Sequence, residues 1–485
     1  MAEASGADAE RRAKLERLRA EGIDPFPHDF DGVTPIAAVH GAQGALEAGA
    51  ETEVGYRVAG RVAARRGHGR AAFLDLIDRS GRIQLHARLD VLGEEAFERV
   101  TSLDLGDLVG VDGTAFKSRR GELTLRVDAW ALLAKSLRPP PEKFHGLEDT
   151  ETRFRRRELD LIANVDTREL FVLRSRVVAG VRRYLDHEGF LEVETPVLQP
   201  LYGGALARPF TTHHNQLDRD LYLRIATELY LKRLVVGGLE RVYELGKDFR
   251  NEGVSSKHNP EFTMLEWYEA YADYEKAAAR LEELVASVVR EVAYAGELDF
   301  TPPWRRVTLR EAVEEATGVD VLAAREPAAL VAAARERGIR GLDPSETWAR
   351  MVDDLLSKHV EPALEQPTFI FDYPEELSPF AKAHRSAPPE DRLVERFECF
   401  AAGIEIANAF SELNDPDEQR ARFEAQAREL AAGDEEAHPY DEDFVRALEQ
   451  GMPPTGGLGL GIDRLVMVLS GRRSIREVVL FPAMR

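Results

Sequence analysis

A change of hydrophobic periodicity near residue 138 divides this sequence into two parts. From about Tyr56 to Leu133, apolar and polar residues alternate between glycines, which predicts several short strands and a small barrel. The proline-rich segment Arg138–Pro141 breaks this pattern and begins a linker. Beyond it, strand and helix patterns mix without a regular β–α–β alternation. The second part is therefore predicted to have an α+β fold instead of a doubly wound sheet.

The predicted organisation has four segments. Residues 1–50 form a short basic helix with a lead-in, 51–137 the barrel, 138–166 the linker, and 167–485 the α+β domain. Within that domain, residues 275–365 are rich in alanine and glutamate at helical spacing, so we expect a helical insertion there. We also expect single strands over Phe397–Asn408 and Val478–Phe481.

Composition excludes several classes of protein. The chain of 485 residues has one cysteine, Cys399, which excludes a disulfide framework and a multi-cysteine zinc site. No apolar run approaches the ~20 residues of a membrane span, and the N-terminus has no apolar signal core, so we expect a cytoplasmic protein.

The net charge of −22 argues at first against a nucleic-acid partner. Residues 51–150, however, hold 16 basic and 16 acidic side chains, so the barrel itself is neutral.

The alternation also separates the two faces of the predicted barrel. Phe73, Gln84 and Glu122 fall on the outward face, and Arg57 and Arg61 lie on the polar side of the first strand. Guanidinium groups, an aromatic ring and hydrogen-bonding side chains together are typical of a surface that binds single-stranded nucleic acid. The alternative is that Phe73 belongs to the core and the arginines form an ordinary solvated face.

A glycine-rich segment of the α+β domain suggests a nucleotide site. In Gly457–Gly461 glycine alternates with an aliphatic residue, which clears one face of a strand for a flat ligand. Arg464 begins the helix that follows, where its guanidinium and the helix N-terminus could meet a phosphate together. The alternative is a strand packed closely beneath a helix.

Two further segments carry charged residues among apolar ones. Tyr243–Tyr268 reads as two strands around a polar loop, and period two places Phe262, Glu266 and Tyr268 on one face. A carboxylate among apolar neighbours favours a ligand-facing surface over a charged hairpin. Glu398–Glu412 spaces carboxylates through an apolar stretch, and buried carboxylates need a cation. Mg²⁺ on substrate phosphates and a substrate ammonium are the candidates, with a structural salt-bridge network as the alternative.

Taken together and in order, these segments resemble the signature motifs of class II aminoacyl-tRNA synthetases. Gly189–Pro196 resembles motif 1, Phe249–Glu252 within residues 243–268 resembles motif 2, and Gly457–Arg464 resembles motif 3. A barrel of the OB-fold before the catalytic domain is the layout of subclass IIb. Longer strings are similar to bacterial-type lysyl-tRNA synthetases, namely Lys143–Leu147, Ala207–Phe210, Thr227–Leu234, Arg250–Tyr274, Phe410–Asp415 and Phe481–Arg485.

The resemblance implies a lysine–tRNA ligase that forms lysyl-adenylate from L-lysine and ATP and passes lysine to the 3′ end of tRNA-Lys. It implies catalytic arginines at the phosphates (Arg250, Arg464) and further ATP-binding residues (Glu252, His258, Asn259, Phe262). It implies Mg²⁺ ligands (Glu398, Glu405) and anticodon-binding residues (Phe73, Gln84, Glu122). The implied lysine-binding residues are Gly204, Glu228, Glu266, Tyr268, Asn408, Phe410 and Glu412. A homodimer formed through motif 1 is also implied, and no membrane association.

Three alternatives stay open. The first is an aspartate or asparagine enzyme of the same subclass, against which the pocket carboxylates count; an aspartate pocket would need a cation, and none of the matched pocket positions is Lys or Arg. A paralogue could attach lysine to another acceptor, and an inactive OB-type protein could bind RNA alone. The sequence departs from many bacterial members at Ala407 and Ala409, where glycine is common, and at Ile404, where arginine is often found. Because the barrel is neutral, tRNA is expected to bind locally, at the basic N-terminal helix and the barrel's outer face, and more weakly in salt.

Overall fold

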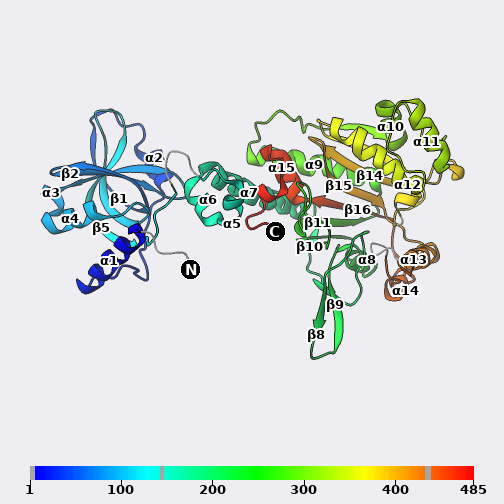
Figure 1. Cartoon of the computed structure of the whole chain (residues 1–485), viewed down its shortest axis with the longest axis horizontal. Coiled ribbons are helices and arrows are strands. Elements are labelled where there is room, and N and C mark those ends of the chain that lie inside the picture. Colours follow the sequence, from blue (N-terminus) through cyan, green and yellow to red (C-terminus); the bar gives the residue numbers. More distant parts are fainter. Residues whose placement is uncertain (1–5, 142–146, 379, 432–437, 485) are drawn as a thin grey trace. The chain divides into compact units, whose positions relative to one another are not determined.

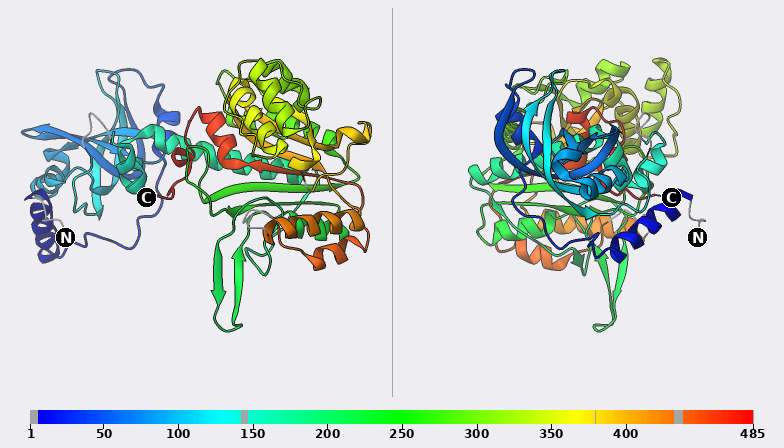
Figure 2. Two further views of the ribbon diagram at one scale, coloured as in Figure 1. Left: turned by 45° about the vertical axis from the view of Figure 1, so that its right-hand side comes forward. Right: turned by 90° about the vertical axis from the view of Figure 1, so that its left-hand side faces the viewer.

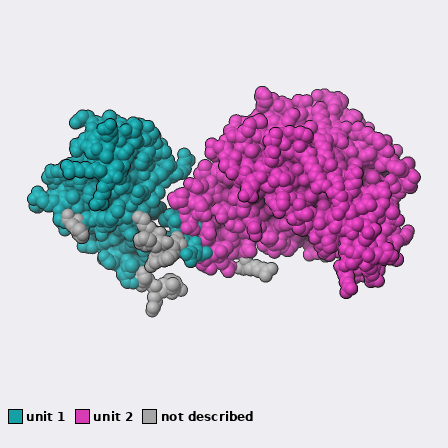
Figure 3. Space-filling model, turned by 90° about the horizontal axis from the view of Figure 1, so that it is seen from above, with its two compact units in different colours: residues 1–148, 158–163 teal, residues 149–157, 164–485 magenta. Residues whose placement is uncertain are grey.

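The structure is a computed structural model that describes residues 6–141, 147–378, 380–431 and 438–484. It divides into two compact units, one of residues 1–148 and 158–163 and the other of residues 149–157 and 164–485 (Figure 3). Lys143–Gly146 and Arg485, parts of two strings that carry the family resemblance, lie outside the described residues. Among the residues described, no helix is long and apolar enough to cross a membrane.

The first unit is built around a closed barrel (Figure 1). Its strands are β1 (Glu51–His68), β2 (Ala71–Ile77), β3 (Arg82–Arg88), β4 (Leu108–Lys117) and β5 (Leu123–Ala134), in the order β1-β2-β3-β5-β4. Leu74, Leu85 and Leu125, which the alternation assigns to the inward face, are fully buried in its core. The helices are α1 (Gly6–Ala20), α2 (Ile36–Gln43), α3 (Leu89–Leu92) and α4 (Glu94–Ser102). The predicted barrel is confirmed.

The second unit is built around a mixed sheet of order β12-β13-β14-β15-β16-β11-β10-β6. The pairs β12–β13 and β10–β6 are parallel, and the other neighbours in this order are antiparallel. The strands are β6 (Leu191–Glu192), β10 (Arg241–Phe249), β11 (Glu261–Ala270), β12 (Arg305–Thr308), β13 (Thr368–Pro374), β14 (Leu393–Ala401), β15 (Ile404–Ser411) and β16 (Thr455–Gly461). This arrangement confirms the α+β prediction.

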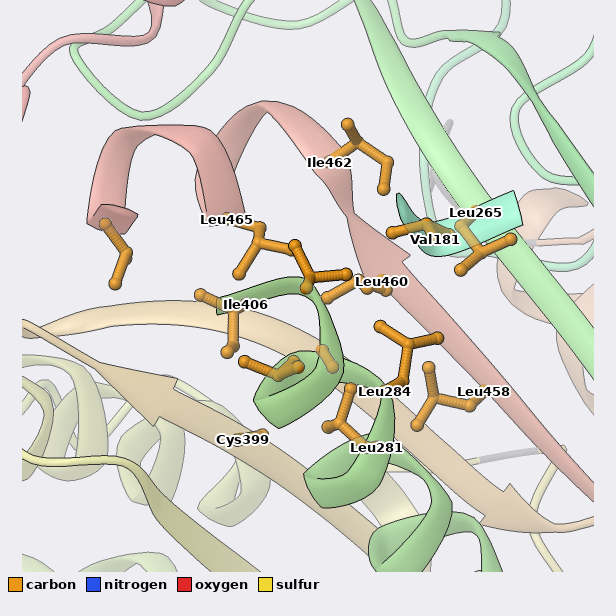
Figure 4. Packing of buried hydrophobic residues seen from close by; sticks show 14 of the residues in the cluster. Val181, Leu265, Leu281, Leu284, Cys399, Ile406, Leu458, Leu460, Ile462 and Leu465 are labelled. Carbon is orange, nitrogen blue, oxygen red and sulfur yellow. The ribbon is translucent and has the colours of Figure 1, made fainter. Parts of the chain in front are cut away.

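One face of this sheet carries the main hydrophobic core (Figure 4). Helices α7 (Val165–His187), α9 (Tyr274–Val292) and α15 (Ile462–Ser470) contribute buried side chains such as Val181, Leu281 and Leu465. These meet strand residues such as Leu265 and Leu460. Alternation along the strands turns their other side chains to the opposite face, so the core fixes which residues a ligand on that face can reach.

Smaller clusters surround the sheet. Helices α10 (Leu309–Thr317), α11 (Pro327–Glu336) and α12 (Trp348–Leu355) pack on β12 and β13, whereas α9 belongs to the main core. Helices α8 (Glu228–Val236), α13 (Pro416–Ala431) and α14 (Glu442–Leu448) pack together through another cluster. Strands β7 (Leu198–Gln199), β8 (Thr211–His214) and β9 (Arg219–Leu223) form a second sheet, whose β8–β9 hairpin projects from the unit (Figure 2). Short helices are α5 (Thr150–Arg155), α6 (Arg157–Ala163) and α16 (Ile475–Val478).

Two strand predictions were wrong. The stretch Phe397–Asn408 is a hairpin of β14 and β15, because Ala402 and Gly403 adopt positive φ angles of 53° and 68° and reverse the chain. Ala402 gives no turn signal in the sequence, so the apolar run looked continuous. The stretch Val478–Phe481 is the end of α16 and a coil, since a short apolar run packed on a core need not be a strand.

Candidate active site

A cavity of about 390 Å³ opens on the face of the sheet opposite the main core. Strands β11, β14, β15 and β16 form its floor, and the loop between β10 and β11 and the turn at Gly204 form its walls. The sequence-predicted residues that line it are Gly204, Glu228, Arg250, Glu252, His258, Asn259, Phe262, Glu266, Tyr268, Glu398, Glu405, Asn408, Phe410 and Arg464. The structure therefore brings together residues from segments far apart in the sequence.

The alternating glycines of β16 form part of the cavity floor. Gly457, Gly459 and Gly461 line the cavity, whereas Leu460 lies in the main core, and Leu458 is buried in that core and also borders the cavity. A Cβ atom added at Gly457 would lie 1.9 Å from Oε1 of Glu412 and 2.5 Å from the Tyr268 ring, so the space there is already filled. At Gly459 the nearest atom to an added Cβ is Sδ of Met264 at 3.7 Å, so the strand face is open at that position.

Two arginines define the basic end of the cavity. Arg464 pairs with Glu405 at 2.7 Å and approaches Nε2 of His258 at 3.3 Å. Burial is the largest influence on the pKa of Glu405 and raises it, but the charge and hydrogen bond of Arg464, together with the charges of Arg396 and Arg250, make the net shift downward. Arg250 lies over the ring of Phe262 at 5.1 Å. In the described part of the chain, no ion pair within 4.0 Å engages Arg250, so its guanidinium is available to an anionic ligand.

The carboxylates Glu398 and Glu405 reach the cavity from the two strands of the β14–β15 hairpin. Glu398 accepts a hydrogen bond from Tyr373 at 2.8 Å and pairs with Arg396 at 2.5 Å, and burial raises its pKa to about 7. Across the described residues, no group of three or more His, Cys, Asp or Glu side chains is arranged to hold a metal ion. Two oxygen-donating side chains fit a Mg²⁺ ion that takes its other ligands from phosphates and water.

Glu266 and Tyr268 define the acidic end of the cavity. Glu266 accepts a hydrogen bond from the backbone N–H of Thr227 at 3.1 Å and one from the Tyr268 hydroxyl at 3.4 Å. Burial raises the pKa of Glu266 to about 8, and the neighbouring charges of Asp248 and Glu228 add to that shift. Such a carboxyl ionises readily only when a cation comes beside it.

Glu412 is placed differently from the other predicted lysine-binding residues. It is 1% exposed and is not among the described residues that line the cavity, and its carboxylate lies next to the Tyr268 ring, where a side chain of Gly457 would point. It forms a close ion pair with Lys232, a residue that the sequence reasoning missed. Lys232 also pairs with Glu228 at 2.6 Å. The spacing Glu228 to Lys232 on a helix signals that pair in the sequence, but nothing there signals the approach of Glu412.

Arg396 is a second residue that the sequence reasoning missed. It lines the cavity, donates a hydrogen bond to Oδ1 of Asn408 at 3.0 Å, and lies 4.5 Å from the centre of the Tyr373 ring. Its position on β14, two residues before Glu398, places both side chains on one face, so the period-two pattern could have identified it.

The salt-bridge network considered as the alternative for the carboxylates of residues 398–412 is also present. Each of Glu398, Glu405 and Glu412 has a cationic partner.

The structure also shows the contacts of Asn259 and Gly204 and the burial of the two alanines at which the sequence departs from many bacterial members. The side-chain amide of Asn259 donates to the carbonyl of Glu261 at 2.6 Å and accepts from the N–H of Ala483 at 3.2 Å, so the chain already engages it. Gly204 has a φ of 88°, and its N–H donates to Nε2 of the buried His438 at 2.8 Å. The departures Ala407 and Ala409 are both buried in the main core, but Ala407 also lines the cavity, whereas Ala409 does not.

The barrel carries a second candidate site. Phe73 on β2 stacks on His86 of β3, with ring centres 4.5 Å apart and planes 3° from parallel. Gln84 donates to Glu122 at 3.1 Å, and the three predicted residues lie on the same outer side of the barrel, although Gln84 is buried there at 8% exposed. The guanidinium of Arg57, which the sequence places on the polar side of the first strand, forms an ion pair with Asp112 at 2.8 Å.

Comparison with known proteins agrees with this geometry. The family described as "tRNA synthetases class II (D, K and N)" matches residues 149–485, and the "OB-fold nucleic acid binding domain" matches residues 56–133. The chain belongs to the class II tRNA synthetases of this D, K and N group, and it is an enzyme of the ligase type.

Relatives named lysine–tRNA ligase resemble the chain over nearly its whole length. The protein of Moorella thermoacetica is 53% identical, covering 98% of this chain and 97% of the relative. That of Synechococcus sp. is 51% identical, covering 98% of each. That of Carboxydothermus hydrogenoformans is 50% identical, covering 98% of this chain and 97% of the relative.

Proposed function

We propose that this chain is a lysine–tRNA ligase, which forms lysyl-adenylate and pyrophosphate from L-lysine and ATP and then transfers lysine to the 3′ end of tRNA-Lys. The observation that carries this proposal is the polarity of one cavity. Its acidic end holds Glu228 and Glu266, which suit the ammonium groups of lysine, and its basic end holds Arg250 and Arg464, which suit phosphates. Relatives of the same name, about half identical over nearly the whole chain, support it.

The first step joins the lysine carboxylate to the α-phosphorus of ATP and releases pyrophosphate. The attacking carboxylate is already anionic, so the reaction requires no enzymic nucleophile or general base. Catalysis then rests on alignment and on stabilising negative charge at phosphorus. We assign the contact with the α-phosphate to Arg250 and that with the γ-phosphate to Arg464. Phe262 would stack on adenine, with Glu252, His258 and Asn259 beside the nucleotide.

We propose Glu398 and Glu405 as the protein ligands of Mg²⁺. When bound, the ion would neutralise charge on the triphosphate. In the structure these carboxylates pair with Arg396 and Arg464, so the same arginines can balance their charge when no ion is present.

Specificity for lysine follows from the charges at the acidic end. The substrate side chain ends in a cation, and Glu266 with Tyr268 offers a buried acceptor for it. An aspartate or asparagine enzyme would need a free cation or donor there. Lys232, the cation nearest this end, is already paired with Glu228 and Glu412. Gly204, Asn408 and Phe410 complete the proposed lysine site.

The direct test is ATP–pyrophosphate exchange with each amino acid in turn, followed by charging of unfractionated tRNA. Exchange that depends on lysine, with charging of a lysine tRNA, is the expected result. Exchange with aspartate or asparagine would contradict the proposal. Exchange with lysine but no tRNA charging would favour a paralogue that uses another acceptor.

Lysine binding is expected to release protons and to strengthen as the pH rises from about 6.5 to 8. Burial raises the pKa of Glu266 to about 8, so this side chain carries a proton in the empty pocket at neutral pH. An ammonium group beside it favours the ionised form, which expels that proton. Isothermal titration calorimetry in buffers of different ionisation enthalpy measures the number released. A binding enthalpy independent of the buffer at pH 7 would contradict this expectation.

We propose Phe73, Gln84 and Glu122 as the anticodon-binding residues. Phe73→Ala is expected to weaken tRNA binding by roughly 5- to 150-fold, because a base stacked on an aromatic ring contributes ~1–3 kcal/mol. Lysine-dependent pyrophosphate exchange without tRNA should not change. Filter binding measures the affinity, and Phe26→Ala, which removes an exposed ring of the same unit, is the matched control. Equal losses in both variants would argue against a specific role of Phe73.

We further propose a cytoplasmic homodimer that forms through motif 1. In this region Leu191, Val197 and Leu198 are 52%, 41% and 47% exposed, an apolar surface that a second copy would cover. Sedimentation equilibrium tests the dimer.

A further inference from the structure

Lys232 is a buried cation that the proposed mechanism does not use. It lies on α8, its side chain is 0% exposed, and it pairs with both Glu228 and Glu412. The ring of Tyr268, on the cavity floor, is centred 6.0 Å from its ammonium nitrogen. A protein-borne ammonium group therefore lies beside residues of the pocket that is proposed to receive the ammonium groups of lysine.

Stability alone does not account for a lysine at this position. A buried ion pair is often no more stabilising than well-packed apolar side chains of similar volume. Leu229 and Val235, three residues before and after Lys232 on the helix, belong to an apolar cluster against which an apolar side chain could pack. The ammonium group is therefore better explained by the carboxylates that it holds.

The charges of the pocket balance only when Lys232 is counted. Glu228, Glu266 and Glu412 carry three negative charges when ionised, and Lys232 reduces their sum to two. The substrate lysine brings two ammonium groups, while its carboxylate is directed to the basic end of the cavity. Two negative charges at the acidic end thus match the two positive charges of the ligand.

We propose that Lys232 is a positioning residue for lysine recognition: its ammonium group holds Glu228 and Glu412 side by side as carboxylates, so that the acidic end presents two net negative charges to the two ammonium groups of the substrate. This inference rests on the proposed lysine–tRNA ligase function. It adds a residue that contacts carboxylates of the site and not the substrate itself.

Removing the ammonium group would change the protonation of the site. Without a cation between them, Glu228 and Glu412 would face each other in a buried setting, and one of them would take up a proton. The other titratable groups beside Lys232 cannot replace it. Burial lowers the pKa of His438 to about 4, so it is neutral near pH 7, and burial raises the pKa of Tyr268 well above its usual value.

The test is Lys232→Met, which keeps the length of the side chain and removes its charge. At pH 7.0 the KM for lysine in pyrophosphate exchange is expected to rise by roughly 10²-fold, as for a broken buried ion pair, while the KM for ATP stays unchanged. The ratio of variant to wild-type KM should fall as the pH is raised to 8.5, by up to about tenfold per pH unit, because the shared proton is then lost more easily. A ratio near one, a ratio independent of pH, or a parallel rise in the KM for ATP would overturn the proposal.

A double-mutant cycle with Glu412→Gln provides a second measurement. If Lys232→Met alone does not fold, the double variant compared with Glu412→Gln carries the test, and a rise in the lysine KM well above about fivefold there would overturn the proposal. In the Glu412→Gln background no second carboxylate faces Glu228, so Lys232→Met should raise the lysine KM by less than about fivefold. An equal effect in both backgrounds would overturn the proposal, because Lys232 would then act independently of Glu412. Wild-type protein that fails to activate lysine would refute the proposed function first. Wild-type activity with the overturning pattern would refute only the role of Lys232.

Discussion

Arg250→Ala is expected to lower the rate of lysine-dependent pyrophosphate exchange by ~10²–10³-fold, as for the loss of one contact that stabilises developing charge. Arg250 lies on the cavity wall above Phe262, and within the described residues no ion pair engages its guanidinium. Its charge is therefore available where negative charge develops on the oxygens of the α-phosphate. The loss should appear mainly in kcat, because the contact strengthens in the transition state.

Arg305→Ala is the matched control for Arg250→Ala. Arg305 is a half-exposed arginine of β12 that pairs with Glu315 and does not line the cavity formed by the described residues. Its replacement should leave exchange unchanged. Near-normal exchange in Arg250→Ala, with a normal thermal unfolding midpoint, would refute the assignment of Arg250.

Glu266→Gln is expected to raise the KM for lysine by ~10²–10³-fold, since breaking a buried charge pair costs roughly 3–5 kcal/mol. Glutamine preserves the shape of the side chain and its acceptor oxygen for the N–H of Thr227. It resembles the protonated form that Glu266 adopts in the empty pocket, where burial raises its pKa to about 8. The variant should therefore fold normally and lose affinity only when the substrate ammonium arrives.

The KM for ATP should not change in Glu266→Gln, because the nucleotide is proposed to bind at the other end of the cavity. Glu261→Gln is the matched control, since Glu261 lies on the same strand with an exposed side chain. Steady-state pyrophosphate exchange with varied lysine and with varied ATP separates the two constants. An unchanged KM for lysine would contradict the proposed role of Glu266.

Much of the site could be predicted from the sequence because side chains along each strand alternate between its two faces. Alternation alone separated Gly459 and Gly461 from Leu460, and the structure places the glycines at the cavity and the leucine in the core. The same period placed Glu266 and Tyr268 on one face of β11, where both line the cavity. This assignment of side chains to the two faces agrees with the structure because a large apolar core covers one side of the sheet. The core allows each strand only the register that turns its apolar side chains toward it.

The chain reversal within residues 397–408 could not be predicted in this way. Ala402 adopts a positive φ that alanine rarely adopts, and the packing of the two strands imposes it. This reversal brings Glu398 and Glu405 onto neighbouring strands. A continuous strand would have set them far apart, so the proposed Mg²⁺ site depends on the turn.

By itself the sequence determined the barrel, the α+β character of the second unit, and which side chains of each strand face a ligand. These properties follow from local periodicity, which the chain carries at every point. Only the tertiary structure decided that Lys232 meets Glu412, that Arg396 reaches Asn408, and that the Glu412 carboxylate fills the space beside Gly457. Such contacts join helices and strands remote in sequence, and they depend on the order of strands in the sheet and on what packs above it. Local patterns contain no information about that order, because a strand alternates in the same way beside any neighbour.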